Sequence, residues 1–301
     1  MKPPTALAHK GVAVEEWVDL RFYRPLGVRL ARALQPSSVS ADEVTLWALM
    51  VGLVGGHLFV YVDWRRNALG FALLIVSDVL DSADGQLARL RGTSTRFGRT
   101  LDGIGDNLRG INIYVHLVIR LFLAGSGWAA LLLGAMAALS HSLQSAAVDF
   151  IRNAYLFATA RAGELDLPED FSDAPPPSPS MSGGGLARFA ARVYRDYVGR
   201  QARLLPRTVR LIRSLRRAPI ADAFRAEYQE LQGPLLPVCA WLGQNIRFAL
   251  VGVTAIAGHP AVYLWAEASV MNVVFLVLVL RHEGNATALR ESLGEAESVY
   301  A

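Results

Sequence analysis

Residues 67–84 read NALGFALLIVSDVLDSAD, an apolar run that contains aspartates near its end. As a helix, a run of this length crosses most of the roughly 30 Å hydrocarbon layer of a bilayer. Hydrophobic residues make up 52% of the 301-residue chain, and no alternation of short strands with amphipathic helices accompanies them. Similar apolar blocks lie at about 44–62, 102–124, 127–152, 234–257 and 260–280. The sequence therefore predicts an all-α integral membrane protein with a bundle of six transmembrane helices.

The segment before the first block mixes aromatic and aliphatic residues with arginines. Residues 14–35, VEEWVDLRFYRPLGVRLARALQ, have the composition of an amphipathic helix that lies on an anionic leaflet. Arginines also crowd the 89–99 connection, the 188–217 stretch and the carboxyl terminus, while the connections near 125 and 258 have none. The positive-inside rule then predicts a multi-pass protein with both termini in the cytoplasm, which we expect in a bacterial inner membrane.

A long insertion separates the fourth block from the fifth. It opens with FSDAPPPSPSMSGGG, a composition typical of a flexible linker. From Leu186 to Arg217 ten arginines then accompany one acid, which favours a cytoplasmic helical insertion on anionic lipid. Without a recognition fold or an aromatic stacking pattern, nucleic acid is not an expected partner. The expected domains are 1–43 (interfacial segment), 44–160 (catalytic spans 1–4), 161–233 (linker and arginine-rich insertion), 234–281 (spans 5 and 6) and 282–301 (cytoplasmic tail).

Four aspartates stand at the ends of the second and third predicted spans. Asp81 and Asp84 are three residues apart and Asp102 and Asp106 are four apart, so each pair shares one face of its helix. Carboxylates at one depth repel each other unless cations lie between them, and oxygen ligands select Mg²⁺, Mn²⁺ or Ca²⁺. The spacing predicts a site for two divalent ions that can clamp a diphosphate. The competing interpretation is a set of solvated acids at helix ends.

These aspartates belong to a longer pattern, D-x-x-D-G-x-x-A-R-x8-G-x-x-x-D-x-x-x-D, which begins at Asp81 and ends at Asp106. The pattern resembles the signature of the CDP-alcohol phosphotransferase (CDP-alcohol phosphatidyltransferase) family. The resemblance implies a six-span homodimer that uses two Mg²⁺ or Mn²⁺ ions to transfer a phosphate-linked group from a CDP-linked lipid or alcohol, releasing CMP at the cytoplasmic leaflet.

The resemblance also implies roles for single residues. Three aspartates would bind metal, and Asp106 would be the general base that also touches metal. The metal ligands would be Asp81, Asp84 and Asp102, and the nucleotide would contact Gly85, Ala88, Arg89 and Gly98. Upstream, where members often carry Pro-Asn-x-x-Thr, this chain has Ala41-Asp42-Glu43-Val44-Thr45. Thr45 fits the pattern as a further nucleotide-binding residue, while Asp42 replaces the asparagine.

A polar stripe on the fourth span is the candidate for binding the acceptor alcohol. The residues His141, Ser145, Asp149 and Arg152 fall at i, i+4, i+8 and i+11, on one helix face. Such a stripe can hold a polar alcohol, and Arg152 can meet a phosphate. Inositol or inositol phosphate is therefore our expected acceptor. The alternative is an internal pair between Asp149 and Arg152.

Other functions stay open. The same motif suits transfer of phosphocholine or phosphoethanolamine from its CDP form to diacylglycerol or another lipid alcohol. A cation transporter would also use intramembrane acids, although we expect it to spread charges through the membrane centre. Elsewhere, we expect Arg247 and Glu267 to form a buried ion pair, and Arg120 to extend to the outer surface.

Overall fold

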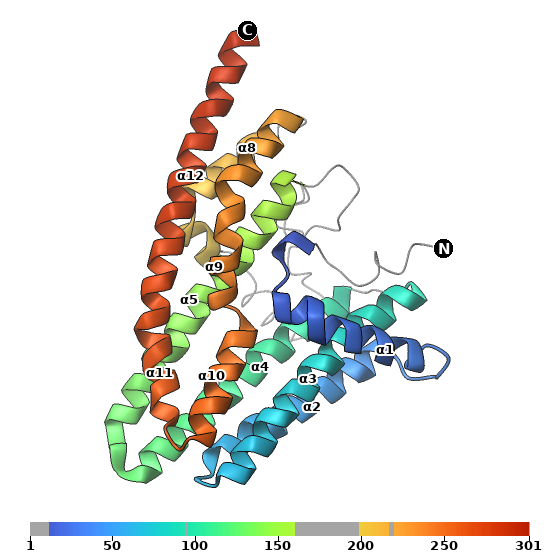
Figure 1. Ribbon diagram of the computed structural model, residues 1–301, viewed down its shortest axis with the longest axis vertical. Coiled ribbons are helices and arrows are strands. Elements are labelled where there is room, and N and C mark those ends of the chain that lie inside the picture. Colours follow the sequence, from blue (N-terminus) through green and yellow to red (C-terminus); the bar gives the residue numbers. More distant parts are fainter. Residues whose placement is uncertain (1–11, 94–95, 160–198, 217–219, 301) are drawn as a thin grey trace, which may run out of the picture. The chain divides into compact units, whose positions relative to one another are not determined.

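The computed structural model describes residues 12–93, 96–159, 199–216 and 220–300; of residues 12, 96–104 and 295–300 it describes the backbone alone. Every regular element in this part of the chain is helical (Figure 1), which confirms the all-α prediction. Segments long and apolar enough to cross a membrane are Ala41–Val60, Gly105–Thr159, Asp222–Ile256 and Pro260–Gly294. They indicate a multi-pass membrane protein, whereas the count of six spans stays a prediction.

The chain divides into two compact units. The first comprises Met1–Ser140 with Gln244–Val270, and the second comprises His141–Gly243 with Met271–Ala301. Helices of the first unit include η3 (Asp19–Tyr23), α1 (Arg24–Leu34), α2 (Ala41–His57), α3 (Trp64–Arg91), α4 (Arg96–Leu121), α10 (Gln244–Ile256) and α11 (Pro260–Ala268). The two units are described separately below.

Local sequence signals set the ends of α2 and α3. Ser40 and Glu43 form a capping box at the start of α2, in which the Ser40 hydroxyl accepts from the Glu43 amide and the Glu43 carboxylate accepts from the Ser40 amide. At the same end of the α2–α3 pair, α3 stops at Gly92, whose φ of 66° is left-handed. The motif aspartates of α3 therefore lie in the last turns of a helix with a defined end.

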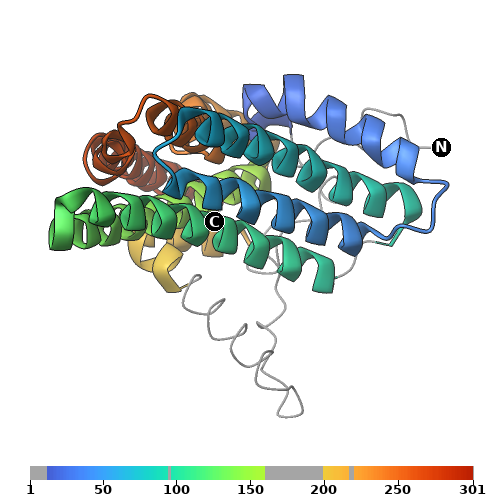
Figure 2. The same ribbon diagram turned by 90° about the horizontal axis from the view of Figure 1, so that it is seen from below.

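Small residues let the helices of the first unit approach closely. A Cβ on Gly55 of α2 would lie 2.9 Å from the Gly70 carbonyl oxygen of α3. A Cβ on Gly27 of α1 would lie 2.5 Å from the Ser82 hydroxyl of α3. The helices α2, α3 and α4 consequently run alongside one another, with α1 against α3 (Figure 2). This packing gathers the amino-terminal segment and the motif helices.

The third and fourth predicted spans correspond to α4 and α5 (Gly127–Thr159). Between them lies η5 (Phe122–Ser126), where Gly125 has a φ of 96°. The two helices then pack against each other, because Val118 of α4 contacts the position of Gly134 on α5. A core that includes Ile113, Leu117 and Leu133 supports this reversal.

Several finer predictions need correction. The predicted span 234–257 is broken between α9 (Leu236–Trp241) and α10, and the predicted span 260–280 is broken at Ser269, between α11 and α12 (Val270–Tyr300). Mean hydropathy does not reveal such breaks, because the helices on both sides of each break are apolar. The segment 14–35, predicted as an amphipathic helix, is helical from Trp17 to Leu34, with the π-helical turn η3 leading directly into α1.

Of the arginines considered above, one prediction is confirmed and one is wrong. Arg247 and Glu267 form the expected buried pair, with Nε 3.2 Å from Oε2 and side chains 3% and 0% exposed. Arg120 is buried rather than extended to the surface, and its Nη1 lies 3.4 Å from the Phe59 carbonyl oxygen. A buried carbonyl thus provides the partner that we expected lipid headgroups and water to supply.

The second unit contains the described part of the arginine-rich insertion. Residues 199–204 are helical, and Pro206 then starts α7 (Pro206–Leu215). The apolar face of α7 is buried within the protein, through Leu211, Ile212 and Leu215. The insertion is helical as predicted, but in these residues its apolar face is already covered. The predicted flexible linker falls on residues 160–198, outside the described part of the chain.

Candidate active site

The last turns of α3 and the middle of α4 bring acidic side chains together in the first unit. Asp78, Asp81 and Asp84 follow one another at intervals of three residues along α3, and Asp106 comes from α4. Asp78 and Asp84 are buried. The carboxylates of Asp81 and Asp106 are 31% and 43% exposed, so they form the accessible side of the cluster.

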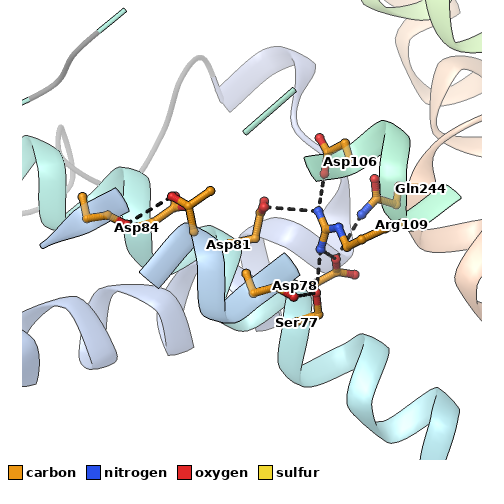
Figure 3. A network of polar contacts seen from close by, with 10 residues as sticks. Ser77, Asp78, Asp81, Asp84, Asp106, Arg109 and Gln244 are labelled. Atoms are coloured by element: carbon orange, nitrogen blue, oxygen red, sulfur yellow. Dashed lines mark hydrogen bonds and ion pairs between the residues drawn. The ribbon is translucent and has the colours of Figure 1, made fainter. Parts of the chain in front are cut away.

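A buried arginine lies among these acids. Arg109, one helical turn after Asp106 on α4, directs Nη2 to Asp81 Oδ1 at 3.1 Å and to Asp106 Oδ1, which lies even closer (Figure 3). Its Nη1 donates to Asp78 Oδ1 at 3.2 Å and to the Ser77 hydroxyl at 2.8 Å. One guanidinium therefore binds three carboxylates from two helices.

The surroundings of Arg109 hold it in place. Gln244 at the start of α10 donates from Nε2 to Asp78 Oδ1 at 3.0 Å. Ser77 donates to the Ala48 carbonyl oxygen at 2.7 Å, which joins the network to α2. On the same helix, Gly52 leaves the space that Arg109 fills, since a Cβ there would lie 2.5 Å from Arg109 Cδ. Arg109 is thus held directly by α3, packed against Gly52 of α2, and supported through Asp78 by α10.

Thr45 reaches the motif from α2. Its hydroxyl donates to Asp84 Oδ2 at 2.6 Å, and both residues are buried. A buried carboxylate needs such donors, because leaving it without them costs its full desolvation. Thr45, picked out by the upstream pattern, therefore lies where it orients one of the predicted metal ligands.

Arg89 and the amino-terminal segment form a second contact zone beside Asp84. Burial lowers the pKa of the Arg89 guanidinium; Arg24 acts in the same direction, while Glu15 and Asp84 oppose the shift. Arginine nevertheless stays charged at neutral pH. Arg24 Nε in turn lies 3.1 Å from Glu15 Oε2. The amino-terminal segment therefore faces the motif with charged side chains.

Tyr23 lies close to the same network. Burial raises the pKa of Tyr23 well above its ordinary value, and the nearby charges of Asp78 and Asp19 add to the increase. The phenol consequently stays protonated at neutral pH. Tyr23 ends η3, so the turn before α1 places a hydroxyl near the buried end of the acidic cluster.

The other predicted nucleotide-binding residues are placed less completely. Gly85 lies on α3 where an added Cβ would be 3.5 Å from Arg89 Nη1, and Ala88 is half-buried on the same helix. Gly98 and Asp102 lie in α4, in the turns for which the structure describes the backbone alone. The side chain of Asp102 is outside the described part of the site.

The predicted acceptor stripe lies on the part of α5 that belongs to the second unit. Its Asp149 carboxylate is exposed and accepts a hydrogen bond from Gln201 Nε2 at 3.3 Å. His141, Ser145 and Arg152 are half-buried. The stripe is therefore present as a helix face of the second unit.

Sequence reasoning missed Asp78, Arg109, Gln244 and Tyr23. The signal for the first two was present in their spacing. Asp78 precedes Asp81 by three residues, and Arg109 follows Asp106 by three, so both share a helix face with a motif acid. A cation does lie between three of these carboxylates, and it belongs to the chain itself, because Arg109 contacts Asp78, Asp81 and Asp106.

The donor set is suitable for a hard divalent cation. Among the described side chains, no three His, Cys, Asp or Glu residues converge as a metal site. Two carboxylates do meet at one cation, because Asp81 Oδ1 and Asp106 Oδ1 both contact Arg109 Nη2. Both carboxylates are accessible, and oxygen ligands of this type suit Mg²⁺ or Mn²⁺. The described residues thus fit two ligands of such a site, beside the backbone position of Asp102.

Comparison with known proteins covers this region. Residues 39–162 match the family model described as CDP-alcohol phosphatidyltransferase, a span that contains α2, α3, α4 and α5. This span, about two fifths of the chain, is similar to a CDP-alcohol phosphatidyltransferase domain. Members of this family are transferases of substituted phosphate groups. The site described above lies inside the domain, except for Gln244 and the amino-terminal segment.

Individual relatives match over shorter stretches. A protein of Mycobacterium tuberculosis strain H37Rv named "Putative cardiolipin synthase" is 36% identical over 63 residues, which are 21% of this chain and 30% of the relative. An Aquifex aeolicus protein named "Uncharacterized protein" is 36% identical over 86 residues, 28% of this chain and 42% of the relative. The matched stretch thus spans less than a third of the mycobacterial relative and less than half of the other.

Proposed function

We propose that this protein is a membrane transferase that moves a phosphatidyl group from CDP-diacylglycerol to a polar alcohol and releases CMP. The observation that carries the proposal is the meeting of Asp81 and Asp106 at the accessible side of the acidic cluster, within the CDP-alcohol phosphatidyltransferase domain. Transfer within phospholipid synthesis is the chemistry of that family. In this reaction the acceptor oxygen bonds to the lipid-bearing phosphorus, the bond from that phosphorus to CMP breaks, and CMP leaves with the electron pair.

The roles proposed for the chain follow the motif. Asp106 accepts the proton of the attacking hydroxyl, a role that its 43% exposure permits. The metal ligands are Asp81, Asp84 and Asp102, with Asp106 also in contact. When bound, two Mg²⁺ or Mn²⁺ ions neutralise the diphosphate and the charge that develops on CMP. The nucleotide lies along Thr45, Gly85, Ala88, Arg89 and Gly98.

Arg89 and Thr45 have supporting positions. The Arg89 side chain lies close enough to Asp84 for their charges to interact, so a nucleotide phosphate near Asp84 is within reach of a guanidinium. Thr45 holds Asp84 through its hydroxyl. We place this site, and both termini, on the cytoplasmic side of a bacterial inner membrane, as the arginine distribution suggests. A homodimer is part of the proposal.

The acceptor is the least specified part. Inositol or inositol phosphate remains our first choice, with His141, Ser145, Asp149 and Arg152 as its binding residues. The name of the mycobacterial relatives adds a second choice. Because cardiolipin carries two phosphatidyl groups on one glycerol, phosphatidylglycerol belongs in any acceptor panel. The CDP part of the substrate is common to all of these reactions.

Release of labelled CMP tests the proposal. Purified protein in lipid vesicles receives Mg²⁺ or Mn²⁺, CDP-diacylglycerol and an acceptor panel of inositol, inositol phosphate, glycerol phosphate and phosphatidylglycerol. We expect CMP only when the right acceptor is present. Turnover of CDP-choline or CDP-ethanolamine with diacylglycerol would instead establish that the head group is the CDP-linked part and the lipid is the acceptor. If no CDP-linked donor is consumed under any of these conditions, the proposal fails.

Neutralising single acids then tests the site. Asp106→Asn should abolish CMP release while the protein stays folded, because the amide accepts no proton. Asp222→Asn is the matched control, since the Asp222 side chain is 83% exposed on α8 (Asp222–Gln232) of the second unit. An Asp106→Asn protein with normal turnover would remove Asp106 as the base.

A further inference from the structure

Arg109 is the largest of the nearly inaccessible side chains in the described part of the chain, at 1% exposure. A buried cation is costly unless carboxylates compensate it. Here Asp78 is the buried partner, and its carboxylate is also held by Gln244. The Nη1 side of the guanidinium is therefore anchored on groups that lie away from the accessible side of the cluster.

The Nη2 side of the same guanidinium faces the accessible acids. It contacts one oxygen of Asp81 at 3.1 Å and one oxygen of Asp106, which comes from a different helix. Since the guanidinium is planar and rigid, anchoring Nη1 also fixes the direction of Nη2. Asp78 therefore sets, through the guanidinium, where the carboxylates of Asp81 and Asp106 are held.

From this geometry we infer that Arg109 is a positioning residue, which orients Asp81 and Asp106 for metal binding through its anchor on Ser77 and Asp78. The inference rests on the proposed function for the identity of the ligand. Partners that orient metal-binding side chains typically contribute about 10–100-fold to metal affinity or activity. Arg109 differs from the usual partners in carrying a positive charge, so geometry and charge have to be separated experimentally.

Arg109→Lys keeps the positive charge and removes the planar guanidinium with its two donating nitrogens. A lysine ammonium is a point charge and cannot hold Asp78 and the Asp81–Asp106 pair in one fixed plane. We expect the Mn²⁺ concentration for half-saturation, measured by the loss of the free Mn²⁺ EPR signal, to rise at least about tenfold. Turnover should fall together with Mn²⁺ binding.

Arg247→Lys is the matched control. Arg247 is also a buried arginine of the first unit, 3% exposed, and its ion-pair partner is Glu267. The two variants should lose similar amounts of thermal stability in detergent, while only Arg109→Lys changes Mn²⁺ binding. An equal change in Mn²⁺ binding in both variants, or none in Arg109→Lys, overturns the inference.

The double variant Asp78→Asn with Arg109→Gln removes the anchor without leaving a buried charge unpaired, so that misfolding does not obscure the result. With Asp78, Asp81 and Asp106 ionised beside Arg109, the local charge is three negative and one positive, or −2. The double variant keeps Asp81 and Asp106 and is also −2, without an uncompensated buried charge. Its Mn²⁺ affinity should fall as in Arg109→Lys. Wild-type affinity in this variant would show that the anchor has no positioning role.

Failure of the proposed function gives a different result. If wild-type protein binds Mn²⁺ in a manner lost in Asp106→Asn but consumes no CDP-linked donor, the proposed reaction fails, and the Arg109 variants still report on positioning. If wild-type protein releases CMP and the Arg109 variants match it in both assays, the positioning role fails alone. Absence of Mn²⁺ binding at Asp106 in the wild type overturns the positioning role itself.

Discussion

The Thr45 hydroxyl donates a 2.6 Å hydrogen bond to Asp84 Oδ2, joining residues that are 39 positions apart in the chain. The bond links the first turns of α2 to the last turns of α3. It connects the upstream part of the family pattern to the aspartate motif in space. The departure at Asp42 therefore leaves this contact intact.

Removal of the Thr45 hydroxyl should impair the site. Thr45→Val keeps the shape of the side chain and deletes the donor to a buried carboxylate, a loss worth about 1–3 kcal/mol. We expect CMP release to fall at least about tenfold, in line with other partners of metal-binding groups. Thr45→Ser, which keeps a hydroxyl, should retain much more activity. The measurement is the rate of CMP release at saturating metal.

Thr254→Val is the matched control for that substitution. The Thr254 hydroxyl bonds to the Leu250 carbonyl oxygen within its own helix, at 2.7 Å, and lies in the same unit. Its replacement should leave turnover at the wild-type rate. A Thr45→Val protein as active as Thr254→Val would show that the hydroxyl of Thr45 does not serve the reaction.

A methyl group at Gly52 should displace Arg109. The Cβ of Gly52→Ala would lie 2.5 Å from Arg109 Cδ and 2.7 Å from the Ser77 hydroxyl, two side chains held by further contacts. Overpacking of this kind costs about 1–3 kcal/mol. We expect weaker Mn²⁺ binding, slower CMP release and a lower thermal midpoint in detergent.

Gly110→Ala separates this effect from the general effect of glycine replacement. Gly110 lies on α4 with nothing within 4 Å of an added Cβ. Alanine is favoured over glycine in a helix interior by about 1 kcal/mol, so this variant should be at least as stable as the wild type. Equal losses of Mn²⁺ binding and CMP release in both variants would mean that the absence of a Cβ at Gly52 is not needed to accommodate Arg109.

The sequence predicted the helices that carry the motif aspartates, at 67–84 for α3 and at 102–124 for α4. The interval of three residues between Asp81 and Asp84 needs only helical geometry to place both on one face, so local spacing was sufficient. The resemblance singled out Thr45 as a nucleotide-binding residue, whereas its contact with Asp84 was not predicted. The spacing from Asp106 placed Arg109 on a motif face, but its pairing with Asp78 joins two different helices and has no local pattern.

Helix breaks were missed for a physical reason. The span predicted at 234–257 is interrupted after Trp241, where Leu242 and Gly243 turn between two apolar flanks. A hydropathy window averages over such a turn, whereas the backbone does not. The same limitation affected the prediction at Ser269, whose hydroxyl bonds back to the Trp265 carbonyl oxygen at 2.5 Å.

The pair of Arg247 and Glu267 permits a prediction about stability. Glu267→Gln leaves the Arg247 guanidinium, 3% exposed, without its carboxylate, and breaking a buried pair from one side costs about 3–5 kcal/mol. The double variant Arg247→Gln with Glu267→Gln should be more stable than Glu267→Gln alone, because no buried charge is left. Thermal midpoints in detergent provide the comparison. A double variant less stable than the single one would contradict this reasoning.

In the second unit, Glu283 caps the start of α7. Its carboxylate accepts from the amides of Arg207 and Thr208 at 2.8 and 2.9 Å, and from the Thr208 hydroxyl at 2.7 Å. A carboxylate at this end also interacts favourably with the helix dipole. Glu283→Gln should therefore speed amide hydrogen exchange across residues 206–215, by roughly tenfold for a loss of about 1.4 kcal/mol. Glu291→Gln, an exposed position on α12, should leave that exchange unchanged, and equal exchange in the two variants would exclude the cap.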